Sequence, residues 1–224
     1  MTFTKSPFGP IAKVTPTDVQ QPNTPSQRAA NGRFSLVASH WRALTVSQRL
    51  EWSSAAVDSR REAADAKKSY RSSGYALYSS LSNLWLQAHN DQGTPPVAPP
   101  SDEWAGPALT ITAAASSGSV VFHGSASTSA GTTIQFEVQR LASGSRKPSK
   151  TGYRVAGFSG LDAGDGNEAS FAVRPGAYCA RYAFVNAATG QRTGFVEIAV
   201  TGVALALEQG GADAKPASAR KKAA

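Results

Sequence analysis

The sequence predicts an α+β protein in which a small N-terminal three-helix region is joined to an antiparallel β-sandwich. Residues 33–90 carry apolar side chains at three- and four-residue spacing, whereas residues 108–206 alternate apolar and polar side chains. Between the two patterns lies a proline-rich segment, 91–107, with two Pro-Pro pairs. Helical spacing and strand alternation each identify one apolar face. We therefore expect two domains with separate cores, joined by a semi-rigid linker.

Composition limits the chemistry that the chain can carry. Its 224 residues include 23 basic and 15 acidic residues, for a net charge of +8, with one cysteine and three histidines. One cysteine excludes an internal disulfide framework, and scattered histidines disfavour a His/Cys metal centre. The sequence contains no apolar run of about 18 residues and no nucleotide-binding, zinc-protease or nucleophile-elbow motif. We expect a protein that is not an enzyme, with no cofactor, no metal and no membrane span.

The two ends of the chain have few bulky apolar residues. Residues 1–32 contain five prolines, at positions 7, 10, 16, 22 and 25, which disfavour a long helix. They are interpreted as an extended arm, either disordered or ordered against a neighbouring subunit. Residues 207–224 are interpreted as a flexible basic tail that ends in Arg220, Lys221 and Lys222.

Helical periodicity predicts three helices, over about 34–44, 46–66 and 75–89. Thr45 and Gln48 have the spacing of a capping box, in which each side chain binds a free backbone N–H. We expect the large side chains of these helices to form the helical core, with part of the set serving as an interface. This set comprises Phe34, Trp41, Leu44, Trp52, Tyr75, Tyr78 and Trp85.

Period-two alternation predicts about seven strands in the second half, separated by Gly- and Ser-rich turns. Ile134, Phe136 and Val138 illustrate the pattern, because polar side chains alternate with them. Trp104, in the linker, is expected to anchor onto one of the two domains. The strands are expected near 109–114, 119–124, 133–141, 152–158, 168–173, 177–185 and 195–203.

Three features of the β region have a structural and a chemical interpretation. Cys179 alternates with tyrosines, which indicates a buried inert thiol rather than a nucleophile. His123 lies in a strand pattern and is interpreted as structural or solvent-facing. The loop with Asp162, Asp165 and Glu168 has turn chemistry, although its oxygen ligands could also hold Ca²⁺.

Two groups of basic residues could contact nucleic acid or an acidic surface, although solvated charge is the simpler interpretation. Residues 33–90 carry eight bases and four acids, so their positive charge is diluted. One group lies in the helical half, and the other lies in a loop of the β half. The residues are Arg60, Arg61, Lys67 and Lys68, and then Arg146, Lys147 and Lys150.

Two resemblances extend this interpretation. The run GAYCARYAFVNAATGQRTGFVEIAV, over residues 176–200, resembles the last hairpin of fibronectin type III and immunoglobulin-like (Ig-like) modules. The spacing W-x-x-L-T-x-x-Q-R-x-x-W from Trp41 to Trp52, followed by S-G-Y-x-L-Y over residues 73–78, resembles a poorly characterised group of phage and prophage proteins. The second resemblance implies a virion or prophage structural component. The W-x-x-L-T junction is also similar to that of HMG boxes, although the order of the elements differs.

The leading expectation is a non-enzymatic bacteriophage virion protein with an Ig-like sandwich, acting as a capsid decoration, neck or tail component. It would assemble in the host cytoplasm, contact other virion proteins and occur as a homo-oligomer or in many copies. One alternative is a DNA-binding or packaging protein that uses the basic helices and the tail. Another is a glycan- or receptor-binding module that uses the loops of the sandwich.

Overall fold

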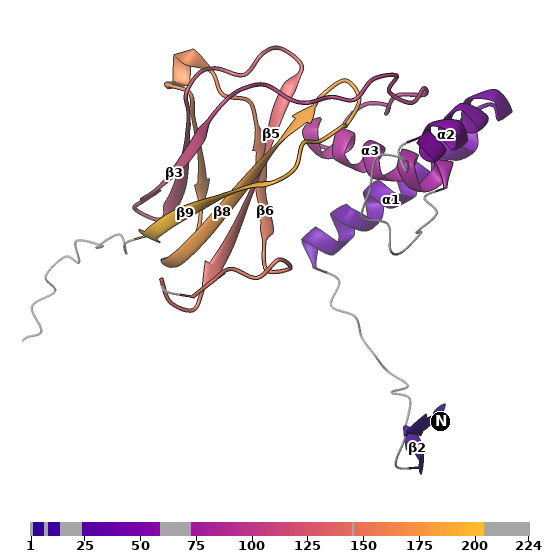
Figure 1. Ribbon diagram of the computed structural model, residues 1–224, viewed down its shortest axis with the longest axis horizontal. Coiled ribbons are helices and arrows are strands. Elements are labelled where there is room, and N and C mark those ends of the chain that lie inside the picture. The colour runs from indigo at the N-terminus through magenta and orange to yellow at the C-terminus, as the bar shows by residue number, and fades with distance from the viewer. Residues whose placement is uncertain (1, 7–8, 14–23, 59–72, 145, 204–224) are drawn as a thin grey trace, which may run out of the picture.

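A computed structural model describes residues 2–6, 9–13, 24–58, 73–144 and 146–203. These residues form an N-terminal hairpin, three α-helices and a seven-stranded sandwich-like arrangement of two antiparallel sheets. The helices lie beside one end of the sandwich, and the hairpin lies apart from both (Figure 1). The expectation of a mixed α+β architecture is confirmed in these described parts.

Helix α1 (Pro25–Ala43) begins inside the segment that the sequence predicts to be extended. Thr24 is its N-cap, because the Thr24 hydroxyl accepts from the Gln27 amide and the Gln27 side chain accepts from the Thr24 amide. Pro25 occupies the first helical position, where the missing N–H costs nothing and the fixed φ favours the helix. The extended interpretation of residues 25–32 is therefore wrong, because Pro25 starts a helix instead of preventing one.

Helices α2 (Val46–Asp58) and α3 (Gly74–Ala88) follow the predicted order. The predicted capping box at Thr45 and Gln48 is confirmed by reciprocal hydrogen bonds of 2.8 and 3.3 Å. Ser73 caps α3 by accepting from the Ala76 amide at 3.2 Å. The remainder of the predicted second helix, from residue 59 onward, lies outside the described residues.

Gly74 lets α2 and α3 approach closely. A Cβ placed on it would lie 2.7 Å from the backbone nitrogen of Ser53, so no larger residue fits without moving α2. Trp52, beside this contact, is almost completely buried and meets the ring of Tyr78 edge-on, with centroids 5.1 Å apart. The helical core contains Val37, Leu44, Trp52, Tyr78 and Leu86, with Trp41, Leu77, Leu81 and Trp85 packed against it.

Strands β1 (Thr2–Ser6) and β2 (Gly9–Lys13) pair antiparallel in a register that matches Thr2 with Lys13 and Ser6 with Gly9. They form a sheet of their own. The predicted arm therefore contains a short hairpin, which lies apart from the helices and the sandwich (Figure 1).

The sandwich consists of a three-stranded sheet in the order β3-β4-β7 and a four-stranded sheet in the order β6-β5-β8-β9. All pairs are antiparallel. The seven strands agree with the predicted ones to within about two residues at each end, the usual uncertainty of boundaries. Their bounds are β3 Ile111–Ser116, β4 Ser119–Gly124, β5 Thr132–Leu141, β6 Arg154–Ser159, β7 Glu168–Ala172, β8 Gly176–Asn186 and β9 Val196–Val203.

The core of the sandwich follows the predicted alternation. Ile134 and Phe136 of β5 are fully buried against Phe122 of β4, whose ring centroid lies 4.4 Å from that of Phe136. Trp104 packs against the same core, so the linker is anchored on the sandwich. On the other face of β5, Thr133, Gln135, Glu137 and Gln139 are polar, as the alternation predicts.

Candidate docking surfaces

The aromatic side chains of the helices divide between core and surface. The Tyr78 ring contacts both Trp41 and Trp52 in the core. Burial raises the pKa of Tyr78, and a side-chain hydrogen bond with Ser82 offsets part of that rise. Phe34 and Tyr75, in contrast, are 56% and 40% exposed. Their assignment to the helical core is wrong, because helical spacing marks the side of a helix but not how far its neighbour covers it. The alternative, that part of this set forms an interface, stays a prediction.

The two exposed aromatic residues line a groove between α1 and α3, with a volume of about 560 Å³. Small side chains give the groove its depth, because they leave room between the two helix backbones. Tyr75 also contacts Trp41 edge-on at 5.5 Å, which ties the rim of the groove to the helical core. The lining is Ala30, Arg33, Phe34, Tyr75, Ala76, Ser79, Ser80, Asn83 and Gln87.

Helix α2 carries a second exposed apolar row. Val46 and Leu50 lie one helical turn apart and are 72% and 65% exposed. Trp52 and Ala56, on another side of the same helix, are buried. The amphipathic stripe of α2 therefore reaches beyond the area that α3 covers.

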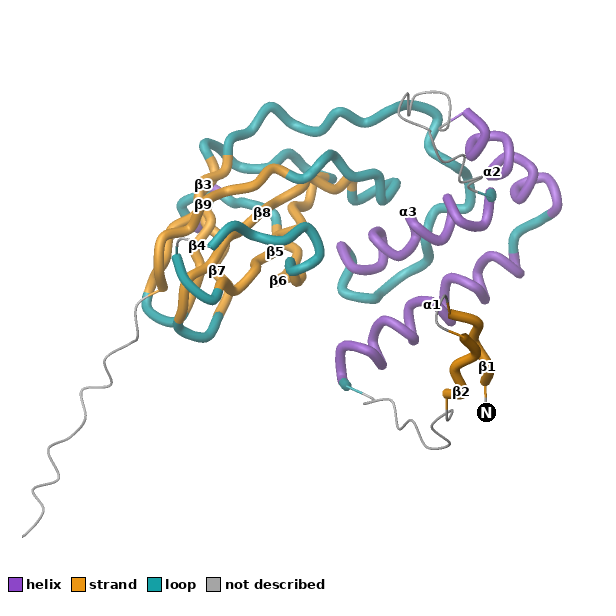
Figure 2. The backbone as a smooth tube through the Cα atoms, turned by 60° about the horizontal axis from the view of Figure 1, so that its bottom comes forward, coloured by secondary structure: helices purple, strands orange, loops and turns teal. Residues whose placement is uncertain are grey.

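The helices, the linker and the sandwich are tied together at several points. Figure 2 shows the linker passing α2 before it crosses to β3. Along this path Val97 accepts a hydrogen bond from Trp52 Nε1 at 2.9 Å, and Asp102 accepts one from Gln191 Nε2 at 2.7 Å. Arg33 of α1 forms an ion pair with Asp91, which follows α3, at 3.1 Å. These contacts place the groove in a defined position relative to the sandwich.

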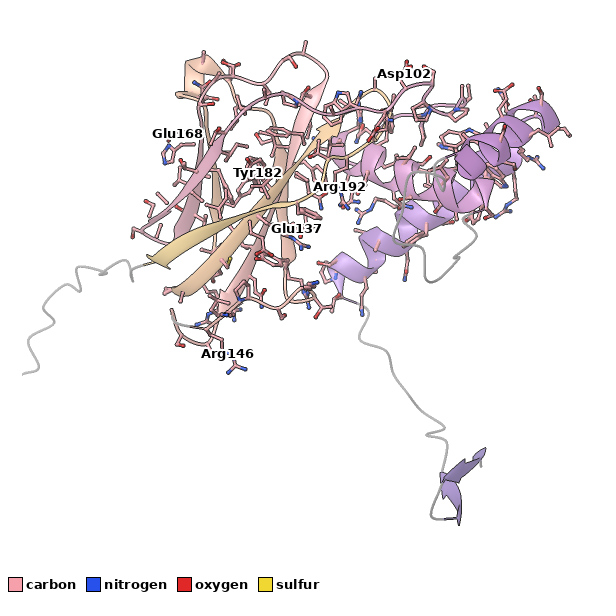
Figure 3. The ribbon with its side chains drawn as sticks, viewed as in Figure 1. Asp102, Glu137, Arg146, Glu168, Tyr182 and Arg192 are labelled. Carbon is pink, nitrogen blue, oxygen red and sulfur yellow. The ribbon has the colours of Figure 1, made fainter. Side chains whose placement is uncertain are left out.

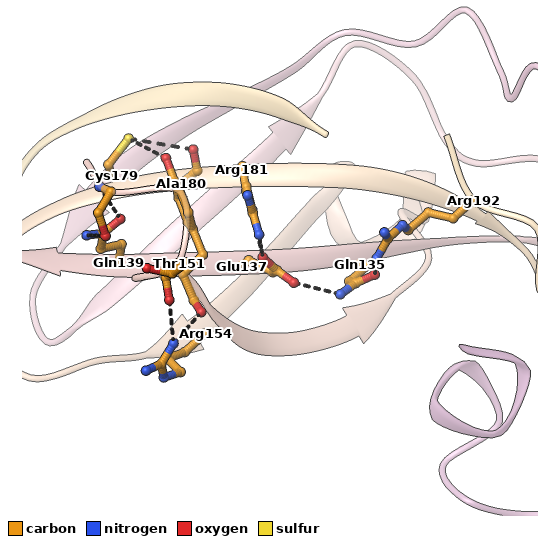
Figure 4. Close-up of polar contacts among 11 residues, drawn as sticks. Gln135, Glu137, Gln139, Thr151, Arg154, Cys179, Ala180, Arg181 and Arg192 are labelled. Atoms are coloured by element: carbon orange, nitrogen blue, oxygen red, sulfur yellow. Dashed lines mark hydrogen bonds and ion pairs between the residues drawn. The ribbon is translucent and has the colours of Figure 1, made fainter. Parts of the chain in front are cut away.

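A polar network covers the outer face of the four-stranded sheet (Figure 4). Glu137 is buried and accepts from Arg181 at 2.7 Å and from Gln135 at 2.8 Å. Gln135 in turn accepts from Arg192 at 3.1 Å. Both guanidinium groups lie within 4.4 Å of the Phe195 ring centroid, so the aromatic ring shields the charges from water. Every member has a partner, which is the arrangement expected of a structural network.

Sequence reasoning did not find this network. The alternation places Gln135 and Glu137 on the outer face, where polar residues are normally solvated. Glu137 and Arg181 face each other across β5 and β8 only in the observed register. Opposite charges on two predicted strands were the available signal, but the register could not be derived from it.

Cys179 is buried, as predicted, and its sulfur lies 3.2 Å from the hydroxyl of Tyr153. Burial is the main cause that raises the pKa of Tyr153, followed by the nearby Cys179 thiol and then Glu197. His123 forms a 2.9 Å contact with Glu168 on the exposed side of β4 and β7, which agrees with a structural or solvent-facing role.

The acidic loop adopts a turn. Asp162 caps a 3-10 helix, Ala163–Asp165, by accepting from the Gly164 amide at 2.8 Å, and Gly166 has a positive φ. No group of three or more His, Cys, Asp or Glu side chains suited to a metal occurs among the residues that the structure describes. The turn interpretation therefore accounts for Asp162.

Of the two predicted basic groups, the structure describes the one in the β half, which lies on a single loop. Arg146, Lys147 and Lys150 are exposed between β5 and β6. Figure 3 shows Arg146 at the end of the sandwich remote from Asp102. The other group, Arg60, Arg61, Lys67 and Lys68, lies outside the described residues, as do Arg220, Lys221 and Lys222.

Comparison with protein-family models and with curated proteins finds no match to this chain. Within the described ranges, no helix has the length and apolar character needed to cross a bilayer. The candidate sites therefore depend on geometry alone. Among them, the groove with Phe34 and Tyr75 combines exposed aromatic surface with a concave shape.

Proposed function

We propose that this protein is a non-enzymatic structural component of a bacteriophage particle that docks onto other virion proteins through its helical surface. The observation that supports docking is the exposure of Phe34 and Tyr75 at the rim of the groove between α1 and α3, whereas the assignment to a phage particle rests on the resemblance of the Trp41–Trp52 motif. Aromatic residues are enriched at the energetic centres of protein interfaces. An exposed apolar groove edged by polar side chains marks a site of interaction.

The chemistry of the groove favours a protein partner. Ala76, Ser79 and Ser80 form a small-residue lining that can receive the side chains of an amphipathic helix. Asn83 and Gln87 supply amide groups along the same face of α3 for a polar rim. A helix whose apolar side chains pack on Phe34 and Tyr75 would bury both rings. Its polar side chains could form hydrogen bonds with the amide groups of the rim.

We further propose that the β region is an Ig-like module. The strand orders β3-β4-β7 and β6-β5-β8-β9 support this assignment. So does Tyr178, near the start of β8, whose hydroxyl donates to the Arg174 carbonyl at 2.6 Å. Such a tyrosine corner is typical of Ig-like domains at the same position. The module would act as a spacer or a second contact surface rather than as a catalyst.

Quantitative mass spectrometry of gradient-purified phage particles tests the virion proposal. The wild-type chain should occur at a fixed ratio to the major capsid protein and stay bound after nuclease treatment. Absence of the chain from purified particles, or an amount that varies between preparations, would contradict the proposal.

A pair of variants tests the groove itself. Phe34→Ser should lower incorporation into particles, because it removes the exposed ring at the groove. Leu36→Ser is the matched control, since Leu36 is also exposed on α1 but does not line the groove. Equal loss in both variants, or in neither, would reject the groove as the docking site.

A further inference from the structure

The N-terminal hairpin lacks the support that a two-stranded sheet needs. β1 and β2 contain five residues each and pair only with each other in the described structure. A two-stranded hairpin is marginally stable in water by itself, whereas a third strand or a packed face gives it stability. Within the described residues, the hairpin therefore has no third strand to support it.

The sandwich has an open edge that offers such a surface. β6 is the terminal strand of the four-stranded sheet, and it pairs with β5 along one side only. The N–H and C=O groups on the other side of an edge strand are a template for another strand. A register shift opposite Phe136 and Glu137 interrupts the pairing of β6 with β5, so only part of β6 is regular enough to receive another strand.

A cleft of about 750 Å³ runs beside this edge. Its walls are β6, with Val155 and Phe158, the first turns of α1, with Ser26 and Ala29, and the end of α3, with Gln87. Because α3 also contacts β6, the cleft is a gap between the edge and the helices. Val155 is 47% exposed, so this edge carries apolar surface that a second chain could bury. Because Ser26 and Ala29 belong to the first turns of α1, that helix begins at the cleft.

We propose that the hairpin of one copy adds to the β6 edge of a second copy, so that copies of the chain are joined by strand addition. In the single chain the hairpin lies away from its own β6 (Figures 1 and 2). The exchange gives the hairpin its third strand and covers Val155 and the open edge. Main-chain hydrogen bonds supply the affinity in this recognition mode. The inference does not depend on the groove between α1 and α3.

Sedimentation velocity on the full-length chain tests the exchange, with three variants for comparison. The first deletes residues 2–13, and the second is Val155→Glu, which places a charge in the cleft. The third, Val196→Glu, is the matched control, because Val196 is 48% exposed on β9 of the same sheet. The wild type and Val196→Glu should associate, whereas the deletion variant and Val155→Glu should each sediment as the 23.3 kDa monomer or slightly below it.

Mixing gives the sharper result. The deletion variant retains the edge and Val155→Glu retains the hairpin, so an equimolar mixture should form a heterodimer that neither variant forms alone. Hydrogen exchange of the β6 amides should be slower in the wild type than in the deletion variant. A wild type that is monomeric at all concentrations would overturn the proposal, whether or not its β6 amides are protected. Association that survives in both variants, or a mixture that stays monomeric, would overturn it as well.

Discussion

Gly190, in the turn between β8 and β9, lies directly against the backbone carbonyl of Leu81 in α3. A Cβ on Gly190 would overlap that carbonyl oxygen and approach Cβ of Trp85 to 3.3 Å. The turn and the helix thus meet backbone to backbone, and this contact helps to fix the helices against the sandwich. The position of the proposed docking groove depends on it.

Gly190→Ala should therefore destabilise the protein more than an ordinary glycine substitution. The matched control is Gly118→Ala, because Gly118 has a φ of +70° against +76° for Gly190 but has no neighbour within 4 Å of the added Cβ. Both substitutions place alanine at a positive φ, which is unfavourable for any residue with a Cβ. Only Gly190→Ala also adds a Cβ that clashes with the backbone of α3. Urea unfolding followed by tryptophan fluorescence should show an additional loss of at least about 1 kcal/mol for Gly190→Ala. Equal losses would mean that the contact adds no stability.

Glu137→Gln should reveal the stability that the buried network provides. The substitution removes the carboxylate that Arg181 contacts and leaves a largely buried guanidinium without its counter-charge. A loss of about 3 kcal/mol in the free energy of unfolding is expected. Glu168→Gln is the control, since its pairing with His123 is exposed and should cost about 0.5 kcal/mol or less. Similar losses in the two variants would show that the burial of Glu137 does not increase the contribution of its ion pair to the free energy of unfolding.

Tyr153 should make the fold sensitive to alkaline pH. Burial, the Cys179 thiol and Glu197 raise the pKa of Tyr153 in the folded protein above its unfolded value of about 10. The unfolded chain then loses the phenolic proton first, so stability is fully present below pH about 10 and falls as the pH rises further.

Tyr153→Phe cannot ionise and should lose less stability than the wild type between pH 9 and 11, a range set about the usual tyrosine pKa. Chemical unfolding at several pH values measures the difference between the two proteins. Contributions from other groups, including Tyr78, largely cancel in that difference. Parallel stability curves for the two proteins would contradict the assignment.

Tyr178→Phe tests the proposed tyrosine corner. The variant keeps the ring but loses the hydrogen bond to the Arg174 carbonyl, and it should be destabilised by about 1 kcal/mol. Thermal unfolding at neutral pH would measure the change. An unchanged midpoint would show that water replaces the bond at no cost, and would remove one support for the Ig-like assignment.

Most of the fold could be predicted because its periodic patterns are long. The strand predicted over residues 119–124 is confirmed as β4, Ser119–Gly124, since alternation and the flanking turn residues agree there. The start of α1 was missed because Pro25 can either end extended chain or begin a helix. The signal was present in Thr24 and Gln27, which have capping-box spacing directly around that proline.

The candidate sites were less predictable, for a physical reason. Apolar residues at helical spacing mark one side of a helix but not how far the neighbouring helix covers it. Phe34 and Tyr75 therefore could not be separated from Trp52 and Tyr78, which are buried. The Glu137–Arg181 pair depends on the register of two strands that are distant in sequence, which periodicity does not specify.

Thiol labelling would test the central claim, that the groove with Phe34 is the docking surface in the particle. The only cysteine of the chain, Cys179, is buried, so a thiol introduced by Ser80→Cys would be the accessible one. Ser80 is exposed and lines the groove, and this near-isosteric change keeps both aromatic rings. Leu36→Cys, on α1 outside the groove, serves as the control. The account predicts that the Ser80→Cys thiol reacts in the free protein and is protected in the assembled particle, while the Leu36→Cys thiol reacts in both. Equal reactivity of the Ser80→Cys thiol in the free protein and in the particle would contradict it.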